Sequence, residues 1–262
     1  MFKLNAYQLK WIAIIGMFLS HALIAWWAII PEWLRFPMYI SGGVTFPIMA
    51  YFVAEGYRHT SNLKRYMLRL FLVGLAALPF HIVALSVPFG AGNPMLYPWV
   101  NIMFSILLSL CVLRLYDKIK HRIVFWLLYI IVIVPVSLLF FEWYFIGVTM
   151  VLMSHIIRNE KARRIVPPMF AGVFMMAIAI LTGSNITPDQ YADFFVLRPE
   201  FQALQIAFSF GCMFVAVLLL AYNGERGRKS KWLFYVFYPA HFVLLAAVGI
   251  ALGLIDLSVL GF

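Results

Sequence analysis

The chain has 262 residues, of which 65% are hydrophobic and only 11% are charged. A soluble domain carries roughly 25% charged residues and needs that polar cover, so the composition excludes a soluble globular protein and favours a membrane protein. The aromatic content of 18% is typical of a protein with two membrane–water interfaces. The net charge of +10 does not indicate nucleic-acid binding, because the basic residues stand in short segments between apolar runs.

The first apolar run, residues 9–30, is long enough to cross a hydrocarbon core of about 30 Å as a helix. It lacks a small-residue cleavage site, so we expect it to be retained rather than removed as a signal peptide. The predicted spans are 9–30, 37–56, 66–87, 98–116, 123–140, 143–158, 165–183, 201–222 and 232–255. Only Glu142 and Trp143 separate the fifth from the sixth, and Pro135 is expected to kink the fifth without ending it.

The distribution of positive charge predicts the orientation. With the N-terminus inside, 18 of the 20 basic residues fall in inner segments, and only Arg35 and Arg198 fall outside. Cytoplasmic loops of membrane proteins are enriched in lysine and arginine. The sequence therefore predicts an all-α polytopic membrane protein, a bundle of about nine transmembrane helices. Its N-terminus is cytoplasmic, its C-terminus is extracytoplasmic, and residues 1–262 form a single domain.

His21 lies in the middle of the first predicted helix, and Lys10 lies eleven residues earlier at its cytoplasmic end. Eleven residues at 100° each return to nearly the same face, about 16 Å along the axis. An ionisable group inside a span is costly and marks a functional candidate. This pair suits a long substrate with an anionic head at the rim and a reactive end at the histidine. The alternative is that Lys10 snorkels and His21 only hydrogen-bonds to a neighbouring helix.

His241 is a second histidine at a predicted depth of about 14 Å in the last helix. It follows Tyr235, Tyr238 and Pro239, and the proline can expose a backbone carbonyl. His21 and His241 could share a proton relay, or His241 could be only a buried hydrogen-bonding group.

The inner end of the second helix is rich in charge. Glu55 at the membrane edge is expected to pair with an arginine, and Arg58 follows three residues later. Arg65 and Arg69 are four residues apart and could hold a phosphate between them. Basic inner loops are, however, what the topology requires in any case. Asn223 stands in an Asn-Gly pair, which is a common turn signal.

Some chemistry has no support in the sequence. The chain contains no His-x-x-x-His or Cys-x-x-Cys cluster, no phosphate-binding loop and no dinucleotide fingerprint, so we expect no metal site. Cys111 and Cys212 both lie in apolar runs, which favours packing over a disulfide.

Several short segments, in order over nearly the whole chain, match the pattern of one known family. They are residues 9–14 with Ser20-His21, Phe46-Pro47-Ile48 through Glu55-Gly56, residues 64–69, 101–105, 222–227 and 231–235, and Tyr238-Pro239-Ala240-His241. On these residues the chain resembles the TraX family of conjugation-associated membrane proteins, within the broader transmembrane acyltransferases. The family usually has Asp-His in the first helix, where this chain has Ser20-His21.

The resemblance implies a multi-pass protein of the bacterial cytoplasmic (inner) membrane that transfers an acetyl or other acyl group. The donor is cytoplasmic acetyl-CoA or another acyl-CoA. The acceptor is a pilin N-terminus, a glycan or a lipid headgroup; the founding family member is tied to N-terminal acetylation of pilin. Apart from these and the membrane lipids, no partner is implied, and no nucleic acid or metal.

Each candidate residue has a role under this hypothesis. His21 or His241 is the general base, and Asn101 or a tyrosine of the last helix donates to the developing oxyanion. The residues expected to bind the acyl-CoA are Lys10, Glu55, Arg58, Arg65, Arg69, Asn223, Tyr235 and Tyr238. Two other functions stay open: a proton-coupled secondary transporter, and a non-enzymatic assembly factor for a surface structure.

Overall fold

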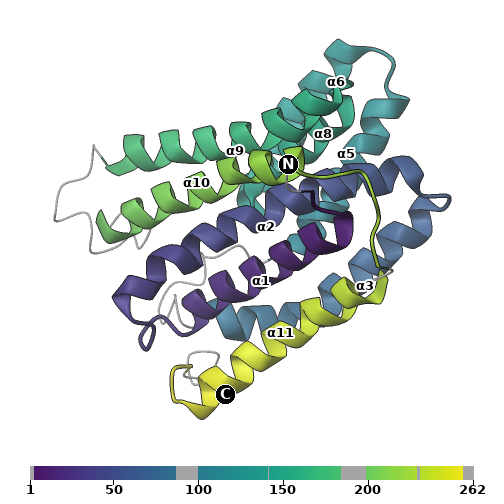
Figure 1. The fold of residues 1–262 in the computed structure, drawn as a ribbon. Helices are drawn as coiled ribbons and strands as arrows, with labels where there is room; N and C mark the ends of the chain where they lie inside the picture. The colour runs from purple at the N-terminus through teal and green to yellow at the C-terminus, as the bar shows by residue number, and fades with distance from the viewer. Residues whose placement is uncertain (1–2, 87–99, 141, 184–198, 229–230, 256–262) are drawn as a thin grey trace. The chain divides into compact units, whose positions relative to one another are not determined.

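The computed structural model describes residues 3–86, 100–140, 142–183, 199–228 and 231–255, and Figure 1 shows their path. The helical elements are α1 (Ala6–Ala25), α2 (Glu32–His59), α3 (Leu63–His81), η1 (Ile82–Ser86), α5 (Ile102–Lys118), α6 (Arg122–Leu128), η2 (Tyr129–Ile133), α7 (Val134–Phe140), α8 (Tyr144–Ile156), α9 (Glu160–Gly183), α10 (Pro199–Leu220) and α11 (Lys231–Ala251). The π-helical turn η1 continues α3, and η2 joins α6 to α7 without a break. Over the described residues the chain therefore forms nine continuous helical segments, and the predicted all-helical class is confirmed.

Six of the described helices are long enough and apolar enough to cross a membrane. They are Ala6–Ala25, Glu32–His59, Leu63–Leu85, Glu160–Leu181, Gln202–Leu220 and Leu233–Ala251. The apolar helices Arg122–Leu138 and Tyr144–Ile156 are shorter. The protein is thus multi-pass by the length and composition of its helices, whereas nine spans and a cytoplasmic N-terminus stay predictions.

Several helices begin earlier than the predicted spans, α2 and α3 among them. α2 starts at Glu32 rather than at residue 37, and Pro37 lies inside it. A proline this close to a helix start removes only one early hydrogen bond, so the helix tolerates it. α3 starts at Leu63 rather than at residue 66, because the Asn62 side chain accepts a hydrogen bond from the Arg65 backbone N–H (2.9 Å) and caps the first turn.

The helical path runs through Pro135 and ends at Phe140. Pro135 has no N–H to donate to the carbonyl four residues earlier, and the π-helical turn η2 lies immediately before α7 and accommodates that gap. α8 begins at Tyr144, so the division falls at Glu142 and Trp143 as predicted.

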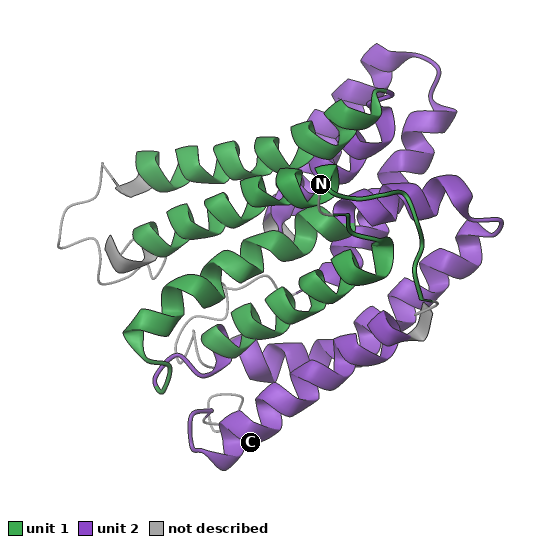
Figure 2. Cartoon of the chain, viewed as in Figure 1, with its two compact units in different colours: residues 1–23, 29–49, 159–228 green, residues 24–28, 50–158, 229–262 purple. Residues whose placement is uncertain are grey.

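The chain divides into two compact units, which Figure 2 colours separately. Unit 1 consists of Met1–Leu23, Ile29–Met49 and Asn159–Arg228, and unit 2 of Ile24–Ala28, Ala50–Arg158 and Lys229–Phe262. The first part of α2 belongs to unit 1 and the rest to unit 2. The single domain expected from the sequence stays a prediction.

In unit 1, glycines bring helix backbones into direct contact. A Cβ atom placed on Gly43 of α2 would lie 2.1 Å from the Phe208 carbonyl oxygen of α10, and one on Gly211 would lie 2.1 Å from that of Ile40. Only glycine allows such an approach, which is the usual way that membrane helices pack closely. Cys212 is buried beside this contact as a free thiol, in agreement with its predicted packing role.

In unit 2, α3 packs against α5 and α11, and α5 packs against α8. Gly74 of α3 again permits close approach, since a Cβ atom there would lie 2.9 Å from the Phe104 ring of α5. Tyr238 and Phe242 of α11 are fully buried and are the largest aromatic side chains of this helix in the core. The face of α11 that carries His241 is therefore an interior face.

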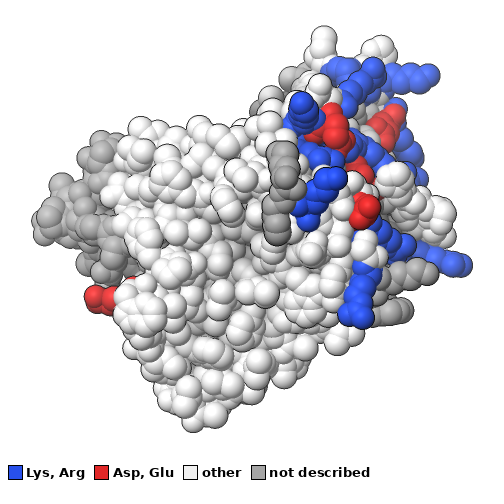
Figure 3. Space-filling view, in the orientation of Figure 1, with Lys and Arg blue, Asp and Glu red and all other residues white. Residues whose placement is uncertain are grey.

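In each unit the basic side chains gather at one end of the helices, here called the basic end, and the helix sides visible in Figure 3 are uncharged. In unit 1 these side chains are Lys3, Lys10, Lys161, Arg163, Arg164, Arg226 and Arg228. In unit 2 they are Arg58, Lys64, Arg65, Arg69, Arg114, Lys118, Lys120, Arg122 and Arg158. Of the two basic residues predicted at the opposite end, Arg35 lies in the first turn of α2 and donates to the Ile30 carbonyl, in the connection that follows the end of α1. Arg198 is outside the described residues.

Candidate functional site

The predicted site residues are divided between the two units. Unit 1 contains Lys10, His21 and Asn223, and unit 2 contains Glu55, Arg58, Arg65, Arg69, Asn101, Tyr235, Tyr238 and His241. Each group is described within its own unit.

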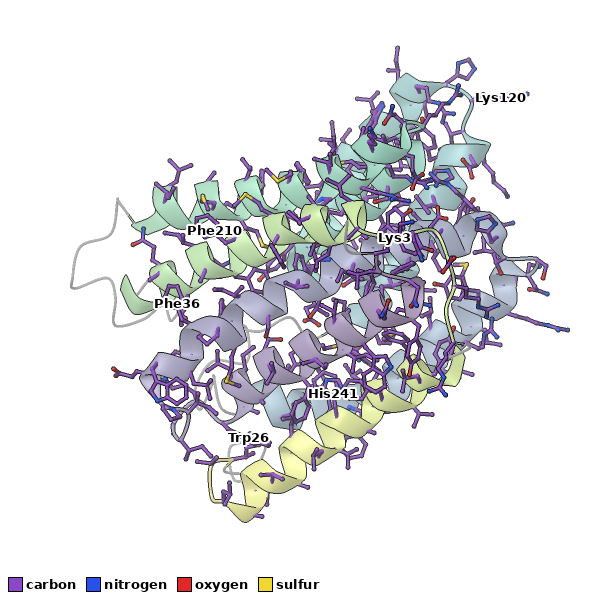
Figure 4. The ribbon with its side chains drawn as sticks, in the orientation of Figure 1. Lys3, Trp26, Phe36, Lys120, Phe210 and His241 are labelled. Carbon is purple, nitrogen blue, oxygen red and sulfur yellow. The ribbon has the colours of Figure 1, made fainter. Side chains whose placement is uncertain are left out.

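His241 lies near the middle of α11, as Figure 4 shows, and is only 2% exposed. Its Nδ1 atom is 3.2 Å from the carbonyl oxygen of Phe237, and the two rings stack with centroids 5.1 Å apart. A carbonyl oxygen can only accept, so Nδ1 is the protonated nitrogen and the neutral ring keeps its lone pair on Nε2. The contact with Phe237 thus favours the tautomer that a general base with Nε2 as proton acceptor requires.

Aromatic rings surround His241. The Tyr238 ring centroid is 5.5 Å away and that of Phe242 is 4.0 Å away. The sequence predicted Tyr238 and His241 as site residues, and the structure brings them together on α11.

Arg69 and Tyr235, both predicted to bind acyl-CoA, meet near the basic end of α3 and α11. The guanidinium carbon of Arg69 is 5.9 Å from the centre of the Tyr235 ring, and Tyr66 is also close enough to interact with Arg69 electrostatically. Within the described residues, the buried Nε of Arg69 donates no hydrogen bond. A guanidinium held between tyrosines in this way offers donors to an anion.

Of the other charged residues of this region, Arg58 and Glu55 form contacts within the protein. Arg58 pairs with Glu55 at 2.9 Å, which confirms that Glu55 has an arginine partner. Arg58 also donates to the carbonyl oxygens of Ser154 (2.8 Å) and His155 (2.7 Å), and so satisfies the last turn of α8. Arg65 is exposed one turn before Arg69. Arg58 thus links α2 to α8, Glu55 pairs with it inside α2, and Arg65 is accessible.

Asn101 caps α5 and joins it to α3. Its Oδ1 accepts a hydrogen bond from the Met103 backbone N–H (3.1 Å), and its Nδ2 donates to the Gly74 carbonyl (2.8 Å). The side chain is fully buried at the end of unit 2 opposite the basic end. One amide proton is left for another acceptor, and the predicted oxyanion role stays a prediction.

In unit 1, His21 is 6% exposed on α1. The preceding Ser20 donates to the Met17 carbonyl of its own helix at 3.1 Å. Position 20 therefore supplies no carboxylate to the imidazole. Lys10 has Arg226 as an electrostatic neighbour, so two positive charges lie at the basic end of this unit.

Asn223 forms the predicted turn. Its Oδ1 accepts from the Glu225 backbone N–H (2.9 Å), and Gly224 has φ +83°, a conformation that glycine adopts without strain. The Asn223 N–H donates to the Leu4 carbonyl, and the Leu4 N–H donates to Ala221, both at 2.8 Å. Asn223 therefore holds the N-terminal segment against the residues that follow α10.

Two clusters were not predicted, and both lie in unit 2. At the basic end, Asp117 of α5 accepts a hydrogen bond from the Tyr57 hydroxyl (2.7 Å) and lies 2.9 Å from His155 Nε2. At the opposite end, His81 Nε2 lies 3.9 Å from a carboxylate oxygen of Glu142. Sequence reasoning treated Glu142 only as a separator, although a single acidic residue between two apolar runs is itself a functional signal.

Among the residues that the structure describes, no group of three or more histidine, cysteine, aspartate or glutamate side chains could hold a metal ion.

Comparison with known proteins adds two matches. A family model described as "TraX protein" matches residues 5–249. The chain is also similar to a protein of Dichelobacter nodosus named "probable fimbrial assembly protein FimC, serogroup H1". The two are 29% identical over 259 residues, which cover 93% of this chain and 95% of that protein. No solved structure matches the chain.

Proposed function

The chain belongs to the TraX protein family, and on this premise we propose that it is a membrane-embedded acyltransferase. It takes an acetyl or other acyl group from cytoplasmic acyl-CoA and transfers it to an acceptor at or beyond the membrane. The name of the Dichelobacter relative favours a fimbrial or pilin subunit as the acceptor over a glycan or lipid headgroup.

The observation that carries the proposal is the arrangement along α11. Tyr235 stands beside Arg69 at the basic end, and His241, with its lone pair on Nε2, lies six residues further along the same helix. Six helical residues span about 9 Å. A donor whose phosphates bind at Arg69 therefore extends its acyl end toward a base in the interior of unit 2. His21 of unit 1 is the alternative base.

The transfer itself needs one base and one leaving group. As the acceptor nitrogen or oxygen bonds to the thioester carbonyl carbon, the histidine accepts the proton of that nitrogen or oxygen. The carbon–sulfur bond then breaks, and CoA leaves as a thiolate that takes the proton back from the histidine. The base is thus regenerated, and neither a metal nor a redox step is needed.

We place the basic end of both units at the cytoplasmic side of the bacterial inner membrane, with the N-terminus inside and the C-terminus outside. The gathering of lysine and arginine at one end of each unit supports this orientation. It also puts Arg69 on the side where acyl-CoA is available.

A second candidate function is a non-enzymatic assembly factor. The name of the Dichelobacter relative favours it, because that name states assembly and no chemistry. If the protein is a non-enzymatic assembly factor, we expect it not to bind acyl-CoA.

The test is release of CoA thiol by the purified protein in lipid nanodiscs, with acetyl-CoA and a pilin N-terminal peptide that has a free amine. Wild type is compared with His241→Ala and His21→Ala, and with His121→Ala as a matched control, since His121 is exposed and makes no cap hydrogen bond. We expect the catalytic base variant to lose about 10²–10⁴-fold in rate and the control to lose nothing. A folded wild type that neither binds acetyl-CoA nor releases thiol would contradict the enzyme and leave the assembly factor.

A further inference from the structure

The pair formed by His81 and Glu142 has no role in the steps above. His81, in the last turn of α3, is fully buried, and the Glu142 side chain, just before α8, is 12% exposed. The imidazole Nε2 and the carboxylate Oε2 are 3.9 Å apart. Both residues lie at the end of unit 2 opposite the basic end, so this is a buried acid–base pair on the side away from the predicted acyl-CoA site.

The backbone holds Glu142 in place from both sides. Its N–H donates to the Val100 carbonyl (3.3 Å), and its own carbonyl accepts from the Ser105 hydroxyl (2.5 Å). The next two residues, Trp143 and Tyr144, have φ values of 66° and 45°. Bulky residues rarely adopt this left-handed conformation, and it persists only where surrounding contacts determine it. The turn therefore fixes the backbone from which the Glu142 side chain projects.

The surroundings of the pair favour a cationic ligand. Trp143 is nearly buried, and Tyr144, which is 40% exposed, interacts electrostatically with Glu142. On the inner side, the Phe242 ring lies 5.1 Å from His81 and 4.0 Å from His241. A carboxylate with aromatic neighbours binds an ammonium group through charge and cation–π attraction, whereas an anion would be repelled.

We propose that Glu142 and His81 form the site that receives the acceptor as a primary ammonium ion and deprotonates it. This inference rests on the proposed acyltransferase function and adds the site for its acceptor. Glu142 binds the ammonium group, and neutral His81 accepts one proton from it, which leaves a free amine and an imidazolium stabilised by the carboxylate.

Two bases are then needed for one acetylation, and the chain supplies both. An ammonium group becomes an amide by losing two protons. His81 takes the first before the attack on the thioester, and the base of the transfer step takes the second during it. CoA leaves with one of these protons, and the other passes to water. A hydroxyl acceptor would lose only one proton and would not require the His81–Glu142 pair.

The experiment compares binding and turnover of a pilin N-terminal peptide with a free amine and of the same peptide after N-acetylation. The variants are Glu142→Gln and His81→Gln. Glu32→Gln is the matched control, because Glu32 is an exposed carboxylate in the first turn of α2. Calorimetry without acetyl-CoA measures peptide binding, and thiol release measures kcat and KM.

We expect wild type to bind the free amine at least about tenfold more tightly than the acetylated peptide, and Glu142→Gln to lose this preference. Glu142→Gln raises the KM for the peptide but leaves the KM for acetyl-CoA unchanged. His81→Gln lowers kcat and shifts the pH–rate profile to higher pH, where the amine loses its proton without help. Glu142→Asp keeps the negative charge, so we expect it to retain the preference for the free amine. This variant is used if Glu142→Gln does not fold.

The possible failures are distinguishable. If wild type transfers acetyl groups, and neither variant changes the peptide KM or the pH profile, the inference is wrong and the acyltransferase stands. If wild type does not bind or use acetyl-CoA, the proposed function is wrong. In that case, a preference for the free-amine peptide that is lost in Glu142→Gln still supports an ammonium site at Glu142. If wild type shows no such preference, the inference of an ammonium site is wrong.

Discussion

The contact between α2 and α10 allows a quantitative test of the packing in unit 1. In Gly43→Ala, the new Cβ atom would lie 2.1 Å from the carbonyl oxygen of Phe208 and 3.0 Å from the Cys212 backbone nitrogen. Both are backbone atoms and cannot rotate away as a side-chain end can. The two helices must therefore separate by roughly 1.3 Å to restore an ordinary contact of about 3.4 Å.

The energetic cost follows from this displacement. Overpacking a well-packed core costs about 1–3 kcal/mol, and a clash between backbones belongs at the upper end. Alanine is a better helix former than glycine by about 1 kcal/mol, which offsets part of the cost. The net loss is about 2 kcal/mol. In a chain of this size, 1 kcal/mol corresponds to about 2–4 °C in Tm, so Gly43→Ala should lower the Tm by about 4–8 °C.

Gly56→Ala on the same helix is the control. Its Cβ atom would meet the Tyr66 hydroxyl at 3.5 Å, an ordinary contact. We expect the Tm of this variant to be unchanged or raised by about 2–4 °C, because only the helix preference changes. Thermal unfolding of wild type and both variants in one detergent, followed by intrinsic tryptophan fluorescence, measures the difference. Equal Tm values for the two variants would refute the close approach of α2 and α10.

Three further outcomes are expected. Arg69→Gln weakens acetyl-CoA binding about tenfold or more in calorimetry, and Arg65→Gln, at an exposed position, weakens it less. In ¹⁵N NMR spectra of histidine-labelled protein, His241 carries its proton on Nδ1; a proton on Nε2 instead would remove the proposed base. Burial raises the pKa of the Glu142 carboxyl group, although nearby His81 opposes the shift. Above the ordinary glutamate pKa, the Glu142 carboxyl group therefore keeps its proton in the folded state after the unfolded chain has lost it. The free energy of unfolding falls as the pH rises through this range, and in Glu142→Gln the dependence of stability on pH becomes flatter there.

The helical architecture was predictable from the sequence because each helix is a long apolar run bounded by charge. The Glu142-Trp143 boundary was found in the same way, from one acidic residue between two apolar runs. What the sequence did not predict are features that depend on local hydrogen bonding. The start of α2 before Pro37 and the π-helical turn before Pro135 arise where backbone groups find partners despite a proline.

The candidate site was predictable where its residues lie on one helix or on helices close in sequence. Glu55 and Arg58 pair within α2, and Tyr238 and His241 share α11. Arg69 and Tyr235 were each predicted to bind acyl-CoA, but the contact between them was not predicted, since more than 160 residues separate them. The contact between His81 and Glu142 was missed because nothing in the spacing of two distant residues shows that the fold places them together.

The backbone hydrogen bonds between the N-terminal segment and the turn after α10 have a consequence for the synthesis and membrane insertion of the protein. Leu4 and Ala6 form backbone hydrogen bonds with residues 221–225, so these residues have partners that are synthesised more than 200 residues later. All of unit 2 except its final helix is synthesised in between. During that time α1 and the first part of α2 are in the membrane with the glycine surface of α2 uncovered. This surface therefore stays uncovered until α10 is inserted, and a truncation before α10, at residue 199, leaves α2 without this partner.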